Sequence, residues 1–540
     1  MTGAAAVPDG RRDRTEPLRR ATLSMAAGTA ASRLSGFARL AVLAAVLGVH
    51  TGISEAYNLA NTTPNMVYDL VMGGVLASTV VPVFVQTLTV YRPARAWRDV
   101  SAVVTVATVI LAVVSGIFIA IAPWVTALYN VGASAARLGA QERVATELLR
   151  LFGLQVLLYG AVTLVTAVLN AERRFVAAAF APVVNNAVVI AVMLVALISY
   201  PHRGVAAASE DQGLVLLLGL GTTGGVAAQL LILLPSLRAC GGRIRWHWDP
   251  RNPAVASIAR LSGWTLGFVS TSQVKLFIVL TLAHALEPLG GATAWTYAYM
   301  FFQLPFGIIA VSIMSADQPE LATAWAGRDG ERFRRRLTGG VRTTLVATVP
   351  AAVGYAFMGA PIVQALLAHG TAARSGTAGT GALLETMALG LPGFSVYIYL
   401  VRAWQAMQDT KTVFLLYAIE NGVNVVLAFA LYRPLGLPGL GLALSAAYTV
   451  AAVVAARRLR RRGAGLVPGA LVASSMRVGT ASVAMAAALW WSEGLLRGAS
   501  PFLVVAVGVA LGITVFGSVA GLGWVWHEWR HSGGVHRRRN

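Results

Sequence analysis

The feature that most constrains this chain is a series of long apolar runs separated by short basic segments. Hydrophobic residues make up 56% of the 540 residues and charged residues only 12%, whereas about a quarter of an ordinary soluble domain is charged. A membrane-spanning helix needs about 20 mostly apolar residues. The sequence therefore predicts an all-α polytopic membrane protein with about 14 transmembrane helices. The predicted spans are 22–48, 56–87, 99–128, 146–171, 176–199, 212–236, 255–285, 292–323, 340–366, 382–407, 412–432, 437–458, 469–492 and 501–527.

The distribution of positive charge predicts how these spans are oriented. The formal net charge is +21, which alone would also fit a nucleic-acid-binding protein. The arginines, however, cluster in alternate loops, such as Arg92, Arg95 and Arg98 after the second span and five arginines between residues 328 and 336 after the eighth. Basic loops of this kind are typical of the cytoplasmic face. With an even number of spans, both termini are predicted to be cytoplasmic, and no nucleic-acid partner is expected.

An internal repeat divides the spans into two halves. A shift of 235 residues pairs Asn170 with Gln405 and Asn186 with Asn421. Transporters built from two bundles of the same orientation hold the substrate between the halves and alternate access around it. We therefore expect two pseudo-symmetric six-helix bundles around a central cavity. The predicted segments are a basic cytoplasmic tail (1–21), an N-terminal bundle (22–236), a basic cytoplasmic linker (237–254), a C-terminal bundle (255–458), two additional helices (459–527) and a second basic tail (528–540).

Charged side chains inside the apolar runs mark candidate substrate-binding residues. An ionised side chain at the centre of a span costs about 2.5–3.5 kcal/mol, so such residues usually face a cavity or a charged partner. Arg33 and Arg39 interrupt the first span, and Lys275 lies well inside the seventh. Because a guanidinium group donates two hydrogen bonds to one phosphate, these cations suit an anionic ligand. The alternatives are that Arg33 reaches the cytoplasmic interface and that Arg39 pairs with an acid.

Acidic and amide residues complete the candidate site. Glu55 opens the second span near its outer edge, where a solvated carboxylate costs little, and Asp69 lies deeper, placed to pair with Arg33 or Arg39. The amides included with them are Asn61, Asn65, Gln273 and Gln303. Eight histidines without ligand spacing, one cysteine and no Walker A motif predict no metal, cofactor or catalytic residue. The remaining energy sources are an ion gradient, the membrane potential or downhill flux, and the sequence names no coupling ion.

Four segments of the sequence carry a resemblance to a known family: 32–39, 61–69, 73–84 and 405–412. They are similar to the MurJ/MviN family of lipid II flippases, in the multidrug/oligosaccharidyl-lipid/polysaccharide exporter superfamily, and the likeness covers essentially the whole chain. The resemblance implies a V-shaped pair of bundles whose cationic cavity takes the head group of an undecaprenyl-pyrophosphate-linked peptidoglycan precursor. It also implies that the two additional helices form a groove for the lipid tail.

The resemblance assigns roles to particular residues. Arg33, Arg39 and Glu55 match charged residues of the family, whereas Tyr68 and Met300 stand where the family has two further arginines. Our hypothesis is that Lys275 supplies part of the missing cavity charge.

The leading prediction is a transporter, not an enzyme, that moves lipid II from the inner to the outer leaflet of the bacterial cytoplasmic membrane by alternating access. One alternative is an exporter of another polyprenyl-pyrophosphate-linked glycan or a MATE-like antiporter. Another is a non-transporting membrane scaffold of cell-wall synthesis. The expected partners are the lipid-linked anionic glycan, the membrane, and proteins of cell-wall synthesis or division.

Overall fold

The computed structural model describes residues 15–70, 80–91, 93–133, 139–202, 204–241, 243–261, 263–286 and 289–536. This part of the chain contains helices and no strand, which confirms the predicted all-α class. The helices are α1 (Thr15–Leu47), α2 (Gly52–Tyr68), α3 (Val81–Val90), α4 (Pro93–Tyr129), α5 (Ala140–Ala171), α6 (Phe175–Ser199), α7 (Val205–Glu210), α8 (Gln212–Leu231), α9 (Leu234–Arg238), α10 (Pro253–Leu261), α11 (Gly263–His284), α12 (Gly291–Pro305), the π-helical turn η4 (Phe306–Ala310), α13 (Val311–Ala326), α14 (Gly330–Leu367), α15 (Thr371–Ser375), α16 (Ala378–Ala388), α17 (Leu391–Ala406), α18 (Thr410–Arg461), α19 (Pro468–Leu495) and α20 (Pro501–His536).

The spans follow the apolar runs of the sequence. Within the described residues, 11 helices are long and apolar enough to cross a membrane, or up to 12 if α16 and α17, which meet at 53°, form one bent span. The 52 residues of α18 would measure about 78 Å as one straight helix, far more than a bilayer core. Gly436, with φ 62° and ψ −142°, breaks α18 into the predicted eleventh and twelfth spans. Of the second predicted span, α2 and α3 are described, and residues 71–79 lie outside the described part.

The chain folds as two compact units, each of which contains segments that are distant in the sequence. Unit 1 comprises Met1–Val46, Ala60–Val125 and Arg143–Leu266, and unit 2 comprises Leu47–Leu59, Thr126–Glu142 and Gly267–Asn540. The short segments 47–59 and 126–142 thus pack with the C-terminal half of the sequence. The segment boundaries expected from the sequence stay predictions.

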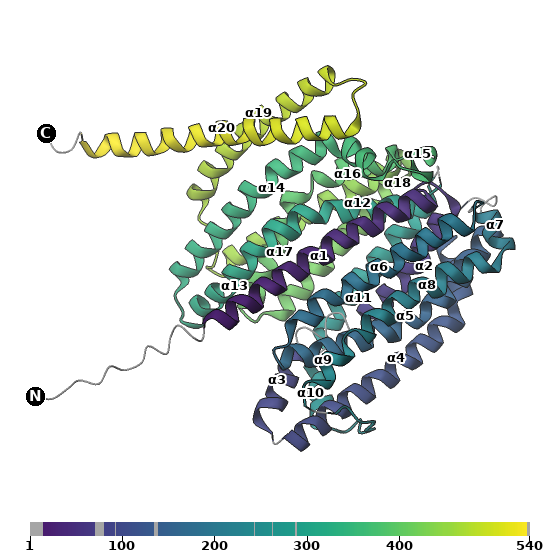
Figure 1. Ribbon diagram of the computed structural model, residues 1–540. Helices are drawn as coiled ribbons and strands as arrows, with labels where there is room; N and C mark the ends of the chain where they lie inside the picture. Colours follow the sequence, from purple (N-terminus) through teal and green to yellow (C-terminus); the bar gives the residue numbers. More distant parts are fainter. Residues whose placement is uncertain are drawn as a thin grey trace, which may run out of the picture. The chain divides into compact units, whose positions relative to one another are not determined.

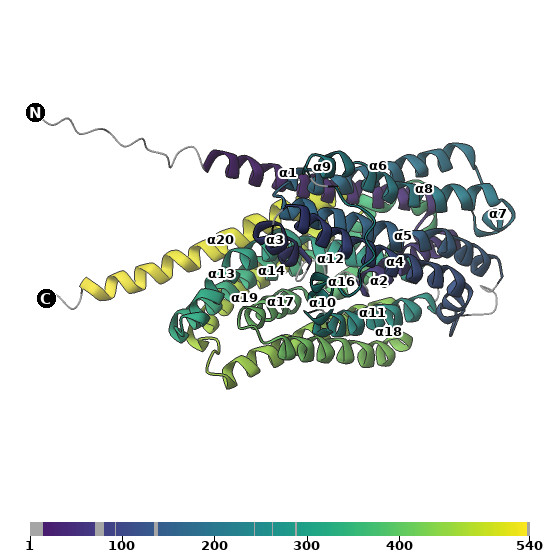
Figure 2. The ribbon, with the colours of Figure 1, turned by 90° about the horizontal axis from the view of Figure 1, so that it is seen from below.

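Unit 1 is held together by close helix approaches at small residues. α6 and α8 run side by side in both views (Figures 1 and 2). A Cβ atom on Gly28 of α1 would stand 2.6 Å from the Cβ of Ala179 in α6, and one on Gly153 of α5 would clash with Ile119 in α4. Ser115 donates a hydrogen bond from Oγ to the Gly153 carbonyl at 2.7 Å. Small residues let apolar helices approach closely, which is how helices associate without a hydrophobic driving force between them.

Unit 2 contains the C-terminal spans and the two additional helices. α17 packs against α18, α14 against α16, and the crossing helices α19 and α20 against each other and against α14 (Figure 1). Asn421 of α18 donates hydrogen bonds to the hydroxyls of Thr271 (3.1 Å) and Ser272 (3.2 Å) in α11.

One hydrogen bond recurs inside each unit at positions that the internal repeat relates. In unit 1, Asn186 of α6 donates to Ser35 Oγ of α1 at 2.9 Å. Asn186 and Asn421 are the residues that the 235-residue shift pairs, and each binds a hydroxyl in the first spanning helix of its own half. This equivalence supports the predicted pseudo-symmetry.

Candidate functional site

The two predicted arginines of α1 lie in an apolar span, and no carboxylate of the described residues pairs with them. Arg33 is exposed and Arg39 half-buried, within a span, Ala27–Leu47, of mean hydropathy 1.5. At 100° per residue, Arg39 projects from the same face as Ser35, which contacts α6, and Arg33 from a face about 120° away. In the part of the chain that is described, neither has a carboxylate oxygen within 4 Å. Their charge is therefore available to an anion.

The predicted amide residues of α2 lie toward the C-terminal end of this helix, in the part that belongs to unit 1. Asn65 donates from Nδ2 to the carbonyl of Asn61 at 3.1 Å. Tyr68 shares a hydrogen bond between its hydroxyl and Thr163 Oγ1 at 2.6 Å. Asp69 follows directly and is half-buried. These contacts make this end of α2 polar, with Tyr68 tied to α5.

Lys275 does not stand free in unit 2. Its Nζ lies 3.1 Å and 3.2 Å from the two carboxylate oxygens of Glu420 in α18, and 5.6 Å from the centroid of the Tyr448 ring. The side chains of Lys275 and Glu420 are 14% and 2% exposed. An ion pair buried this deeply requires both partners, because removing one leaves an uncompensated charge. The geometry gives Lys275 a pairing role within unit 2, whereas its predicted contribution to a cavity stays a prediction.

Glu55 is completely buried, with an exposed fraction of 0%. Its carboxylate accepts hydrogen bonds from the backbone N–H groups of Ala292 (3.0 Å) and Thr293 (3.3 Å), at the start of α12. His284 Nδ1 lies 2.9 Å from the same carboxylate, and His284 Nε2 lies 3.2 Å from Asn130 Oδ1. The solvated-carboxylate alternative for Glu55 is therefore wrong, since the side chain joins three segments of unit 2 through an interior network.

His284 links two side chains of this network: one ring nitrogen contacts the Glu55 carboxylate and the other contacts the side-chain oxygen of Asn130. The positive end of the α12 dipole adds to the stabilisation of the Glu55 carboxylate. Glu55 thus acts as a structural anchor of unit 2.

The predicted site residues are divided between the two units. Gln273 of α11 and Gln303 of α12 are both half-buried in unit 2. Unit 1 therefore contains Arg33, Arg39, Asn61, Asn65 and Asp69, and unit 2 contains Glu55, Gln273, Lys275 and Gln303.

An apolar groove of about 460 Å³ lies in unit 2 among α14, α19 and α20. Tyr355 and Met358 of α14, Met485 of α19 and Phe516 of α20 line it, together with glycines of α20 such as Gly512. A Cβ atom on Gly512 would stand 2.9 Å from Met485 Cε, so the glycine keeps this side of the groove open. Its size and apolar lining fit a hydrocarbon chain.

Sequence reasoning missed three residues that these contacts identify: Glu420, His284 and Asn130. Glu420 carried a signal, because it is an acidic residue inside the predicted eleventh span, beside Asn421 of the repeat. His284 and Asn130 carried none, since each lies at the end of a span, where polar residues are ordinary.

Comparison with known proteins places these observations in a family. The family model described as "Lipid II flippase MurJ" matches residues 43–508. The probable lipid II flippase MurJ of Rhizobium meliloti is 29% identical over 482 residues, which cover 88% of this chain and 87% of the relative. The lipid II flippase MurJ of Burkholderia cenocepacia is 27% identical over 453 residues, 82% of this chain and 84% of the relative.

Solved structures share the fold. A structure of the lipid II flippase MurJ in an inward closed conformation superposes with a TM-score of 0.75 at 18% identity, and the match covers 92% of this chain and 98% of that one. An inward-facing multidrug resistance transporter of the MATE family gives a TM-score of 0.66 at 16% identity, covering 79% of this chain and 94% of that one.

Proposed function

Because the chain belongs to the lipid II flippase MurJ family, we propose that it moves lipid II, the lipid-linked peptidoglycan precursor, across the bacterial cytoplasmic membrane by alternating access. The observation that carries this proposal is the pair Arg33 and Arg39. Two guanidinium groups without a carboxylate partner among the described residues, set in an apolar span, suit the diphosphate of such a substrate.

The apolar groove of unit 2 suits the hydrocarbon tail of the same substrate. A polyprenyl diphosphate has a charged head and a long hydrocarbon tail, and the two need different surroundings. The groove formed by α14, α19 and α20 offers apolar side chains to the tail. The head group would then change leaflets while the tail stays in contact with lipid.

The orientation belongs to the same proposal. Basic segments such as 239–251 and 457–462 lie at the ends of apolar helices, and we place them on the cytoplasmic side, together with both termini. Proteins of cell-wall synthesis or division are proposed as partners on functional grounds alone.

The test uses cells depleted of their own flippase that carry only this protein. We expect the parent chain to support growth and to expose newly made lipid II on the outer leaflet, where an impermeant probe reaches it. Arg33→Gln and Arg39→Gln should each reduce this exposure at equal protein levels, whereas Arg457→Gln, a change of an exposed arginine at the end of α18, should not.

Two outcomes contradict the proposal at different levels. If the parent chain reaches the membrane but exposes no lipid II, another lipid-linked glycan or a scaffold role replaces the proposed function. If the parent works and both α1 variants work equally well, lipid II is the substrate but Arg33 and Arg39 do not bind its diphosphate.

A further inference from the structure

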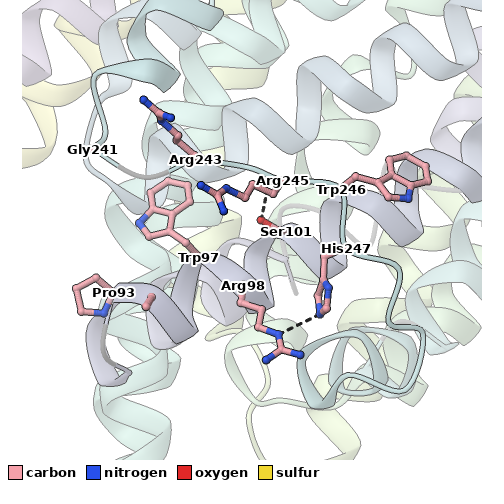
Figure 3. A pocket seen from close by; sticks show the side chains of 10 residues that line it. Pro93, Trp97, Arg98, Ser101, Gly241, Arg243, Arg245, Trp246 and His247 are labelled. Atoms are coloured by element: carbon pink, nitrogen blue, oxygen red, sulfur yellow. Dashed lines mark hydrogen bonds between the residues drawn. The ribbon is translucent and has the colours of Figure 1, made fainter.

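A second basic region of unit 1 contains no residue of α1, and the proposed transport does not use it. A cavity of about 730 Å³ opens between the start of α4 and the segment that follows α9, of which residues 239–241 and 243–252 are described. Trp97 and Arg98 of α4 line one wall, and Arg243, Arg245, Trp246 and His247 line the other (Figure 3). We call this cavity the α4 pocket.

The wall formed by the segment is held in a fixed position by hydrogen bonds to α4. The backbone N–H of Arg245 donates to Ser101 Oγ at 3.1 Å, and that of His247 donates to Thr105 Oγ1 at 3.1 Å. Both hydroxyl residues are buried, 2% and 3% exposed. Asn252 donates from Nδ2 to Asp99 Oδ1 at 3.0 Å and fixes the end of the segment. The basic side chains are therefore presented by a pre-formed wall.

The α4 pocket is basic, and none of its described lining residues is acidic. Three of these residues are arginines. Arg98 Nε donates to His247 Nε2 at 3.2 Å, which joins the two walls of the pocket (Figure 3). In the described part of the chain, none of Arg98, Arg243 and Arg245 has a carboxylate oxygen within 4 Å. Planar guanidinium groups gathered in this way match a phosphate.

The tryptophans indicate where that phosphate comes from. Trp246 is 73% exposed, and in Figure 3 it points away from Trp97, Arg243 and Arg245, which gather at the other end of the pocket. Trp248, in the same segment, is 52% exposed. Large indole rings left in water are unfavourable, whereas indole is favoured at the level of lipid head groups. The pocket also lies at the polar end of α4, where the apolar part of that helix begins.

We propose that the α4 pocket binds the phosphate of an anionic membrane phospholipid, with Arg243 and Arg245 on the phosphate and Trp246 among the neighbouring head groups. Basic pockets beside membrane-spanning helices bind acidic lipids in this way. The assignment does not depend on the transported substrate, because none of its residues belongs to α1 or to the apolar groove.

The experiment measures lipid binding to the purified full-length protein. Phosphatidylglycerol, phosphatidylcholine, inorganic phosphate and undecaprenyl diphosphate are each titrated against the parent and against the double variant Arg243→Gln/Arg245→Gln. We expect phosphatidylglycerol to bind the parent saturably and the double variant at least about tenfold more weakly. Arg251→Gln, which changes an exposed arginine of the same segment outside the pocket, should bind like the parent, and unchanged thermal melting shows that each variant is folded.

Two tryptophan variants test the proposed contact of Trp246 with the lipid head groups. Trp246→Ala should weaken phosphatidylglycerol binding, and Trp248→Ala, which alters an exposed indole that does not line the pocket, should weaken it less. Parent-like binding by the double arginine variant overturns the proposal. Displacement of phosphatidylglycerol by inorganic phosphate at millimolar concentration also overturns it, since the pocket would then bind a soluble anion. Tighter binding of undecaprenyl diphosphate that is lost in the double variant overturns it as well, since the pocket would then bind the transported lipid.

Discussion

Lys275 of unit 2 and Arg33 of unit 1 are both cations inside apolar helices, yet their surroundings are opposite. Lys275 is almost buried and lies 3.1 Å from a carboxylate oxygen of Glu420, whereas Arg33 is exposed and has no carboxylate within 4 Å among the described residues. A paired cation ties two helices together, and an unpaired one can bind a ligand. The same kind of residue therefore serves structure in one unit and is available for recognition in the other.

Two arginine-lined pockets, one in each unit, repeat this contrast. In unit 2, a pocket of about 670 Å³ between α13 and α14 contains arginines with acidic partners. Arg336 lies 2.7 Å from Asp317, and Arg332 lies 2.8 Å from Glu320. The α4 pocket of unit 1 has comparable size and three arginines but no acidic residue among those described that line it. Arginine content alone thus does not identify an anion site, because neighbouring carboxylates decide whether the charge is available.

The largest expected effect comes from breaking the buried pair. Glu420→Gln should lower the free energy of unfolding by about 3–5 kcal/mol, because it leaves Lys275 charged and unpaired in the interior. The double variant Lys275→Met/Glu420→Leu should recover much of this loss, since it removes both charges. Denaturation of the purified proteins in one detergent measures both. If the double variant is as unstable as the single, the ion pair is not the cause.

A smaller loss is expected at Glu55. Glu55→Gln keeps the shape of the side chain but removes the charge that faces His284 and weakens the hydrogen bonds from Ala292 and Thr293. We expect a destabilisation of about 1.5–3 kcal/mol. The matched control is Glu493→Gln, at an exposed site near the end of α19, which should stay within about 0.5 kcal/mol of the parent. Equal melting of the two variants would show that the Glu55 network adds no stability.

The pocket between α13 and α14, whose arginines have acidic partners, allows a comparison of a buried contact with an exposed one. Tyr399 donates from its hydroxyl to Asp317 Oδ2 at 2.8 Å, in a buried setting. Tyr399→Phe should therefore cost about 1.5–2 kcal/mol. Arg332→Gln, which breaks a pair whose side chains are 53% and 49% exposed, should cost at most about 1 kcal/mol. The reverse order in a denaturation series would show that the exposed Arg332–Glu320 pair stabilises the protein more than the buried Tyr399–Asp317 hydrogen bond does.

The smallest change in stability is expected at Arg33 and Arg39, which have no carboxylate partner among the described residues. Arg33→Gln and Arg39→Gln should melt within about 0.5 kcal/mol of the parent, because no ion pair is lost, while lipid II exposure falls. Destabilisation above about 2 kcal/mol would mean that these arginines stabilise the fold, and it would remove the contrast between the units.

The single cysteine of the sequence reports on which side of the membrane the α4 pocket lies. Partial burial raises the pKa of the Cys240 thiol above its usual range, so less of it is thiolate at a given pH. Labelling by an impermeant maleimide should be slower than for a free thiol at pH 7.5 and should accelerate as the pH rises. In intact cells the label should appear only after permeabilisation, and labelling without it would place the pocket on the outer side.

The spans and the repeat could be predicted from the sequence because both depend on local properties. A run of apolar residues long enough to cross a bilayer has few alternatives to a helix, since every backbone polar group must be bonded internally. The break at Gly436 agrees with the predicted separation of the eleventh and twelfth spans. Equivalent asparagines at a constant shift make equivalent contacts because each half folds in the same way.

The roles of the charged residues, in contrast, came only from long-range packing. Glu55 stands at the start of a span, where its sequence surroundings fit a solvated carboxylate, but backbone groups more than 200 residues away bury it. The partner of Lys275 is 145 residues distant, and no local pattern connects the two. The length of the apolar runs and the distribution of basic residues between the loops determine where a chain crosses a membrane. The burial and pairing of each charged side chain depend on which distant helices pack against it in the folded units.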